Sequence, residues 1–214
     1  MKIFPVYYFP PVSWFVAAEH EGKIILEAWE HYRKQQLYNR TRIMTANKVL
    51  KITIPIRKAK EHTALCKREI SYDWNWPREH WTSITSAYRS SPYFEFYEDQ
   101  LEPLFTERRT SLMELNLAII DVVRSAMGLS FTYELSEAYR GEDHYARDYR
   151  RAFDHKGEQL PAWFHAEPYQ QVFGEEFTPD LSILDLLCCN GPAGVQVLKE
   201  GWKAESEGRA MGFS

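Results

Sequence analysis

Residues 38–56, YNRTRIMTANKVLKITIPI, carry the pattern that decides the fold class. Apolar side chains occupy every second position in the second half of this stretch: Leu50, Ile52, Ile54 and Ile56. A period of two is typical of a β-strand with one buried face. Residues 38–45 and 49–56 therefore predict two strands, joined by a hairpin turn at residues 46–48. Pro55 has no N–H to donate, so it marks an edge strand or the end of the second strand.

Two more strands are expected upstream of this hairpin, and helices dominate downstream. Ile3–Phe9 is rich in β-branched and aromatic residues and ends at a proline pair, and Lys23–Trp29 is a second strand-like run. After these strands the apolar period becomes helical. The clearest helices are expected at residues 110–127, closed by Gly128, and at residues 179–189.

This order of elements favours a mixed α/β class of α+β-like character over alternating βαβ units. We expect one domain over residues 1–214, with a central mixed sheet built mainly from the N-terminal third and packed by helices from the C-terminal two-thirds. The runs at 3–9, 23–29, 38–45 and 49–56 should all join this sheet.

Composition excludes several classes of protein. With 44% hydrophobic and 26% charged residues, the chain is neither disordered nor fibrous. It shows no signal peptide and no run near the ~18 apolar residues of a membrane helix. Its three cysteines, Cys66, Cys188 and Cys189, form no CxxC pair, which favours a reducing cytoplasm without disulfides or zinc.

Positive charge is concentrated in the first third of the chain. The net charge is −4, yet residues 31–68 hold eleven basic residues and the single acid Glu61. Two interpretations stay open: a solvated face balanced by the acidic remainder, or a site for an anionic ligand. Nucleic-acid binding is not favoured, because the whole chain is acidic and no predicted helix carries a basic stripe.

The densest polar cluster covers residues 27–42. Within it His31 is the natural proton carrier near neutral pH, and Arg40 offers a two-pronged donor for carboxylate or phosphate. An extended segment would place two sets of side chains on opposite faces: His31, Arg33 and Gln35 on one, Tyr32, Lys34 and Gln36 on the other. The alternative is a solvated edge strand, where Lys and Arg discourage aggregation.

Polar residues also lie in the predicted helices. Asn116 belongs to an apolar stripe, so its amide must be hydrogen-bonded, either inside a pocket or to the backbone. Asp185 is expected to hold a neighbouring loop, because no histidine stands near it in sequence. Cys188 and Cys189 are expected to be inert buried thiols. The usual motifs for metal and nucleotide binding (HExxH, GxGxxG, GxxxxGK[ST]) are missing, so we expect neither a metal nor a cofactor.

Six segments, in this order, resemble the WbqC-like family: YYFPP at 7–11, EHYRKQQLYNR at 30–40, TIPI at 53–56, HWTSITSAYRSSPYFEFY at 80–97, MELN at 113–116 and PYQQVFGEEFTPDLSILDLLCCNG at 168–191. They span nearly the whole chain. The chain departs from the family pattern in two places. Cys188 and Cys189 replace a Phe-Asn-like ending, and residues 158–168 match poorly.

The resemblance implies a bacterial setting. Members occur in gene clusters for surface polysaccharide such as O-antigen, and a glycine or acyl transferase role has been suggested for them. The positions that match the family's polar residues are candidates for a site: Tyr8, His31, Tyr32, Lys34, Gln35, Asn39, Arg40, Asn116, Tyr169, Gln170, Asp185 and Asn190.

We therefore predict a transferase that moves an acyl or aminoacyl group, glycyl included, onto an amino-sugar without a metal. His31 would accept the proton of the attacking amine, while Arg40 and Lys34 hold an anionic small-molecule donor. The remaining substrate-binding candidates are Tyr8, Tyr32, Gln35, Asn39, Asn116, Tyr169 and Gln170.

The competing hypothesis is a non-catalytic protein that binds a sugar or a partner through its aromatic side chains. A concave site holding His31 and Arg40 together would favour the enzyme. An open aromatic shelf would favour the binding protein. The oligomeric state is not predicted.

Overall fold

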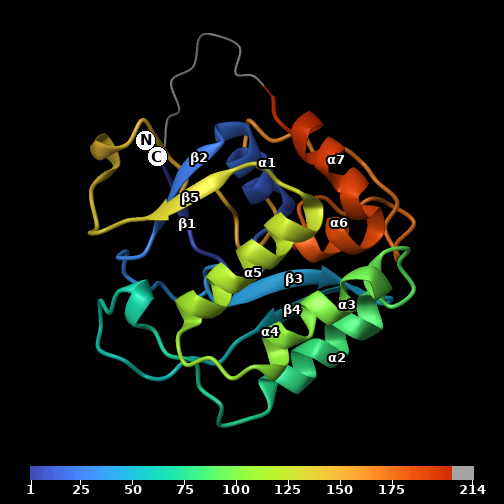
Figure 1. Ribbon diagram of the computed structural model, residues 1–214, viewed down its shortest axis with the longest axis horizontal. Helices are drawn as coiled ribbons and strands as arrows, with labels where there is room; N and C mark the ends of the chain where they lie inside the picture. Colours follow the sequence, from blue (N-terminus) through green and yellow to red (C-terminus); the bar gives the residue numbers. More distant parts are fainter. Residues whose placement is uncertain (204–214) are drawn as a thin grey trace.

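The computed structural model describes residues 1–203, and its N-terminal strands belong to a parallel sheet (Figure 1). The four strands lie in the order β5-β2-β1-β6 and are all parallel. They are β1 (Lys2–Pro5), β2 (Lys23–Glu27), β5 (Thr132–Leu135) and β6 (Arg147–Asp148). Ile3 of β1 pairs with Ile25 of β2 and is fully buried.

A buried helix connects the two central strands. α1 (Val12–Glu21) is buried over its first seven residues, which are almost all apolar. It ends at Gly22, whose φ of +70° lies in the region that glycine adopts readily, and the Gly22 N–H donates to the Ala18 carbonyl. β1, α1 and β2 thus form one βαβ unit.

The hairpin of residues 38–56 is present, but it forms a sheet of its own. β3 (Arg40–Met44) and β4 (Val49–Thr53) are antiparallel, with Met44 opposite Val49. The prediction that all four N-terminal runs share one mixed sheet is wrong, because β5 and β6 take the places beside β2 and β1. An alternating pattern defines strands and their turn without defining the sheet they join.

The α-helices that follow the hairpin lie between residues 76 and 200, and the mixed α/β class is confirmed. The helices are α2 (Trp76–Tyr88), α3 (Phe94–Leu101), α4 (Pro103–Thr106), α5 (Leu112–Met127), α6 (Ile183–Asn190) and α7 (Gly194–Glu200). Short 3₁₀ helices are η1 (Leu65–Lys67), η2 (Glu142–His144) and η3 (Gly191–Ala193).

α5 and α6 have recognisable ends. Ser111 caps α5 by accepting the Glu114 N–H, and Gly128 follows in the left-handed conformation. α6 begins later than predicted, because Ser182 pairs with Pro11 in a β-bridge before it caps the helix. In Figure 1, α5 runs across the molecule between the parallel sheet and the β3–β4 hairpin.

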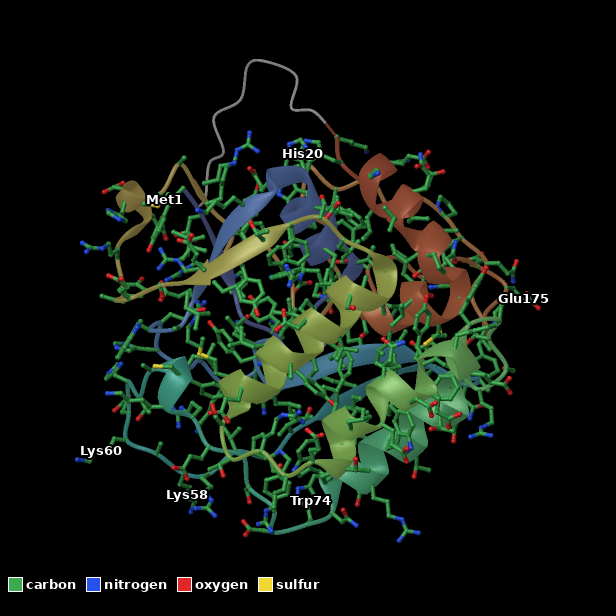
Figure 2. The ribbon with its side chains drawn as sticks, in the orientation of Figure 1. Met1, His20, Lys58, Lys60, Trp74 and Glu175 are labelled. Atoms are coloured by element: carbon green, nitrogen blue, oxygen red, sulfur yellow. The ribbon has the colours of Figure 1, made fainter. Side chains whose placement is uncertain are left out.

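The basic residues of 31–68 are mostly solvated. Figure 2 shows Lys58 and Lys60 at the outer edge of the molecule, and both are exposed. Arg42 and Arg68 differ, with only 9% and 8% of their surface exposed. Within residues 1–203, no helix is long and apolar enough to cross a bilayer.

Candidate functional site

The carboxyl ends of the parallel strands form the edge of the sheet at which α/β proteins bind ligands. β2 and β5, the next two strands of this sheet in the chain, lie on one side of β1. β6, the last strand, lies on the other side of β1. In open α/β sheets, ligands bind outside the carboxyl ends of the strands, at the point where the connections from neighbouring strands lead to opposite sides of the sheet. The loops that follow β2, β5 and β6 lie at this edge of the sheet.

A buried ion network ties these three loops together. Arg150, after β6, donates its Nη1–H to Oε2 of Glu27 at 3.0 Å, and its Nε lies 3.0 Å from both carboxylate oxygens of Asp148. The other oxygen of Glu27 accepts the hydroxyl of Ser136, after β5, at 2.7 Å. The side chains of Arg150 and Glu27 are almost wholly buried. These charge-assisted hydrogen bonds hold the three loops together where they leave β2, β5 and β6.

A cavity of about 200 Å³ lies among these loops. Five residues line it: Glu30, His31, Arg33, Tyr139 and Arg151. They come from the segments after β2, β5 and β6, so the fold brings together residues more than a hundred positions apart. A buried acid, an imidazole and two guanidinium groups share one space.

Glu30 is the buried acid of this cavity, with 5% of its surface exposed. Burial raises the pKa of its carboxyl to about 7, and the nearby Tyr38 hydroxyl and Arg33 guanidinium offset part of that rise. Arg33 Nη2 lies 3.8 Å from Oε2 of Glu30. Oε1 has no hydrogen-bond partner in residues 1–203. A carboxyl with this pKa exchanges protons near neutral pH, which suits a general acid or base.

His31 and Arg33 face the same cavity, whereas Tyr32 between them does not line it. This agrees with the alternation predicted for an extended segment. The His31 backbone forms a β-bridge with Ala64, and its ring centre lies 5.0 Å from that of His62.

A second cavity of about 530 Å³ adjoins the first, because Arg33 and Arg151 line both. Its other walls are Gln36 and the segments 152–155 and 159–162. Amide, carboxyl and imidazole groups stand there beside apolar ones. A cavity of this size accommodates a small organic ligand.

The structure does not bring Arg40 to the cavity that His31 lines. The chain between them turns at residues 34–38 instead of continuing as a strand. Arg40 begins β3 and is half-buried. Asn39 accepts the Tyr32 hydroxyl at 3.0 Å and donates to a backbone carbonyl of the hairpin at 2.6 Å.

The two exposed residues of the turn line neither cavity. Lys34 and Gln35 both face solvent, and Gln35 has a positive φ of +66°. The next residue, Gln36, lines the larger cavity in their place.

Tyr8 and Asn116 are fully buried and have no surface to offer a substrate. The Tyr8 hydroxyl is hydrogen-bonded to Nδ1 of His80 at 2.9 Å, and burial lowers the pKa of His80 to about 4, so that ring is neutral at physiological pH. Asn116 donates to the Tyr38 carbonyl at 2.8 Å. The predicted burial of Asn116 is confirmed, and of the two predicted kinds of partner the structure shows the backbone: the bond ties α5 to the segment before β3.

Tyr169 belongs to a different cluster, at α6, whereas Gln170 is exposed and donates to the Gln171 carbonyl. Tyr169 donates its hydroxyl to Oδ2 of Asp185 at 2.8 Å, and Gln171 donates to the same oxygen at 2.7 Å. Asp185 therefore holds a neighbouring loop, as predicted. Burial raises the pKa of the nearby Cys189 thiol to about 12, which keeps it protonated and unreactive.

Sequence reasoning missed the half of the site that comes from residues 139–162. That stretch has no clear period, so no local pattern marked Tyr139 or Arg151. The available signal was the cationic pair Arg150-Arg151 in the acidic part of the chain. In residues 1–203 no three His, Cys, Asp or Glu side chains gather as metal ligands.

Comparison with known proteins agrees with the resemblance seen in the sequence. The model of the WbqC-like protein family matches residues 6–156 and 144–197. The uncharacterized protein Rv1507c of Mycobacterium tuberculosis (strain ATCC 25618 / H37Rv) is 28% identical over 209 residues, which covers 84% of this chain and 89% of that protein. No solved structure matches the chain.

Proposed function

We propose that this chain, which belongs to the WbqC-like protein family, is a transferase that moves an acyl or aminoacyl group, glycyl included, from an anionic donor onto an amino-sugar. The setting that the family suggests is the synthesis of bacterial surface polysaccharide. The observation that carries the proposal is the cavity shared by Glu30, His31, Arg33 and Arg151.

Arg33 and Arg151 take over the role that the sequence suggested for Arg40 and Lys34. Their side chains line both cavities, and guanidinium groups bind phosphate or carboxylate oxygens through two parallel hydrogen bonds. A donor held by them would present its activated carbonyl at the boundary between the cavities, close to Glu30.

The proposed reaction is attack by the acceptor's amine on that carbonyl carbon. A C–N bond forms, the bond to the thiolate or phosphate leaving group breaks, and the amine gives up one proton. Glu30 accepts the proton, because its pKa of about 7 makes it a proton acceptor at neutral pH. His31, an exposed residue of the same cavity, passes the proton on to solvent or to the leaving group.

The larger cavity is the proposed place for the sugar. Gln36, Asp154 and His155 supply donors and acceptors for hydroxyl groups there. Its opening toward Arg33 and Arg151 would let an amino group of the sugar reach the donor.

Turnover measurements test these roles. The protein is incubated with acetyl- and glycyl-thioesters of coenzyme A and with 2-amino-2-deoxyhexoses, and new amides are measured by mass spectrometry. Glu30→Gln should lower kcat by roughly 10²–10⁴, the usual effect of losing a general base. Arg151→Met should raise KM for the donor. Arg89→Met is the control, because Arg89 is exposed and pairs with Glu98 away from the cavities.

Two results would count against the proposal. Turnover by Glu30→Gln at the wild-type rate would remove Glu30 from the reaction. Binding of amino-sugar without amide formation from either donor would favour the non-catalytic binding protein, for which the exposed Tyr139 and Leu160 at the two cavities supply sugar-contacting surface.

A further inference from the structure

Two arginines lie around Tyr32, outside both cavities: Arg68 stacks on its ring, and Arg40 follows its hydrogen-bond partner Asn39 in the chain. The guanidinium carbon of Arg68 lies 4.7 Å from the centre of the Tyr32 ring. The Tyr32 hydroxyl donates to Oδ1 of Asn39 at 3.0 Å, and Arg40 is the next residue in the chain. Burial raises the pKa of the Tyr32 hydroxyl, and the charges of Arg40 and Arg68 oppose that rise. Arg68 is 8% exposed and Arg40 is half-buried.

Neither guanidinium has an acidic partner in residues 1–203. The Nε atoms of both are buried and lack a hydrogen-bond partner among these residues. Other shielded arginines are satisfied: Arg150 pairs with Glu27 and Asp148, and Arg42 donates to the Asp180 and Lys156 carbonyls. A buried cation without a counter-ion is costly, and this cost falls mainly on Arg68, the more buried of the two.

The surrounding structure holds this pair in place. Arg40 lies at the start of β3, opposite Thr53 of β4. Arg68 follows η1, and its carbonyl accepts the Leu112 N–H at 3.0 Å, which joins it to the first turn of α5. Tyr32 is fixed by its hydrogen bond to Asn39. The cations are thus positioned by separate elements, which favours a preformed site over a mobile surface cluster.

We propose that Arg40 and Arg68 form a binding site for the phosphate group of a phosphorylated small molecule, with the Tyr32 hydroxyl at its side. Two guanidinium groups supply several N–H donors and two positive charges, which match the oxygens and the double charge of a phosphate. A monocarboxylate would neutralise only one of the charges. None of the three residues lines either cavity, so this site is independent of the proposed transferase chemistry.

Phosphate titration tests the site. Isothermal titration calorimetry at constant ionic strength measures binding of inorganic phosphate to wild type, Arg40→Met and Arg68→Met. Each substitution should weaken binding about tenfold, because a hydrogen bond between charged groups contributes about that much. Arg40→Lys keeps the charge without the two-pronged geometry and should give an intermediate loss. Arg89→Met should bind as wild type does.

Equal phosphate affinity in wild type, Arg40→Met and Arg68→Met would overturn the proposal, and so would the absence of phosphate binding by wild type. A parallel titration with a hexose phosphate distinguishes the source of the anion. The protein should bind the hexose phosphate more tightly than it binds inorganic phosphate, and this result would identify a phosphorylated metabolite as the ligand. Binding of hexose phosphate that does not change in the two Met variants would contradict the site.

Discussion

Arg150 and Arg68 are both buried arginines that stack on tyrosine rings, and they differ in what neutralises them. Arg150 lies 4.9 Å from the ring centre of Tyr139 and pairs with two carboxylates. Arg68 lies 4.7 Å from the ring centre of Tyr32 and forms no ion pair among the described residues. The comparison teaches that pairing, more than burial, separates an arginine that holds the fold from one that can bind a ligand.

Removing Arg150 should have the largest effect on stability. Arg150→Met would leave Glu27 and Asp148 without their cation, and breaking a buried pair from one side costs about 3–5 kcal/mol. The free energy of unfolding in urea measures this loss. A loss as small as that of the exposed control Arg89→Met would show that the network does not tie the loops together.

Glu30 should make stability depend on pH. Its pKa of about 7 in the folded protein lies above its ordinary value of 4.5, so the folded state binds more protons between these values and stability falls as pH rises through 7. The Glu30→Gln variant has no carboxyl at this position and therefore lacks this pH-dependent contribution to stability. Its free energy of unfolding, relative to wild type, should rise by about 3 kcal/mol between pH 4 and pH 8. A difference that stays flat with pH would place the Glu30 carboxyl in solvent.

Asn116→Leu should cost about 1–3 kcal/mol, because it leaves the Tyr38 carbonyl without its donor. Urea denaturation of the variant measures the loss. An unchanged midpoint would mean that this hydrogen bond adds nothing to the packing of α5.

Arg68→Met should have the smallest effect on stability and should not destabilise the fold as Arg150→Met does. In phosphate-free buffer, removing an unpaired buried charge while keeping most of the side-chain volume should leave the unfolding free energy unchanged or raise it. A clear loss would show that Arg68 supports the fold through its contact with Tyr32, and the comparison with Arg150 would fail.

Local patterns predicted the elements whose character depends on nearby residues. The alternation of residues 50–56 predicted β4 and its turn, and the apolar stripe with Gly128 predicted α5. The buried amide of Asn116 followed from its place on that stripe. Each of these features depends on side chains within a few positions of one another.

Features that depend on distant pairing could not be predicted in this way. β6 has two residues, too few to show a period. Its place beside β1, opposite β2, determines where connections lead to the two sides of the sheet. Arg151 reaches the cavity of His31 from 120 positions away. Arg68 belongs to the same basic run as the exposed Lys58 and Lys60, and only the folded structure shows that it is buried without a partner.

An anomalous difference map from crystals soaked in tungstate, a phosphate-like anion with strong anomalous scattering, distinguishes the two arginines. We expect a peak between the guanidinium groups of Arg40 and Arg68 and none at Arg150, whose donors are already used by Glu27 and Asp148. A map with no peak at Arg40 and Arg68, or with a peak at Arg150 instead, would contradict the distinction between the two arginines.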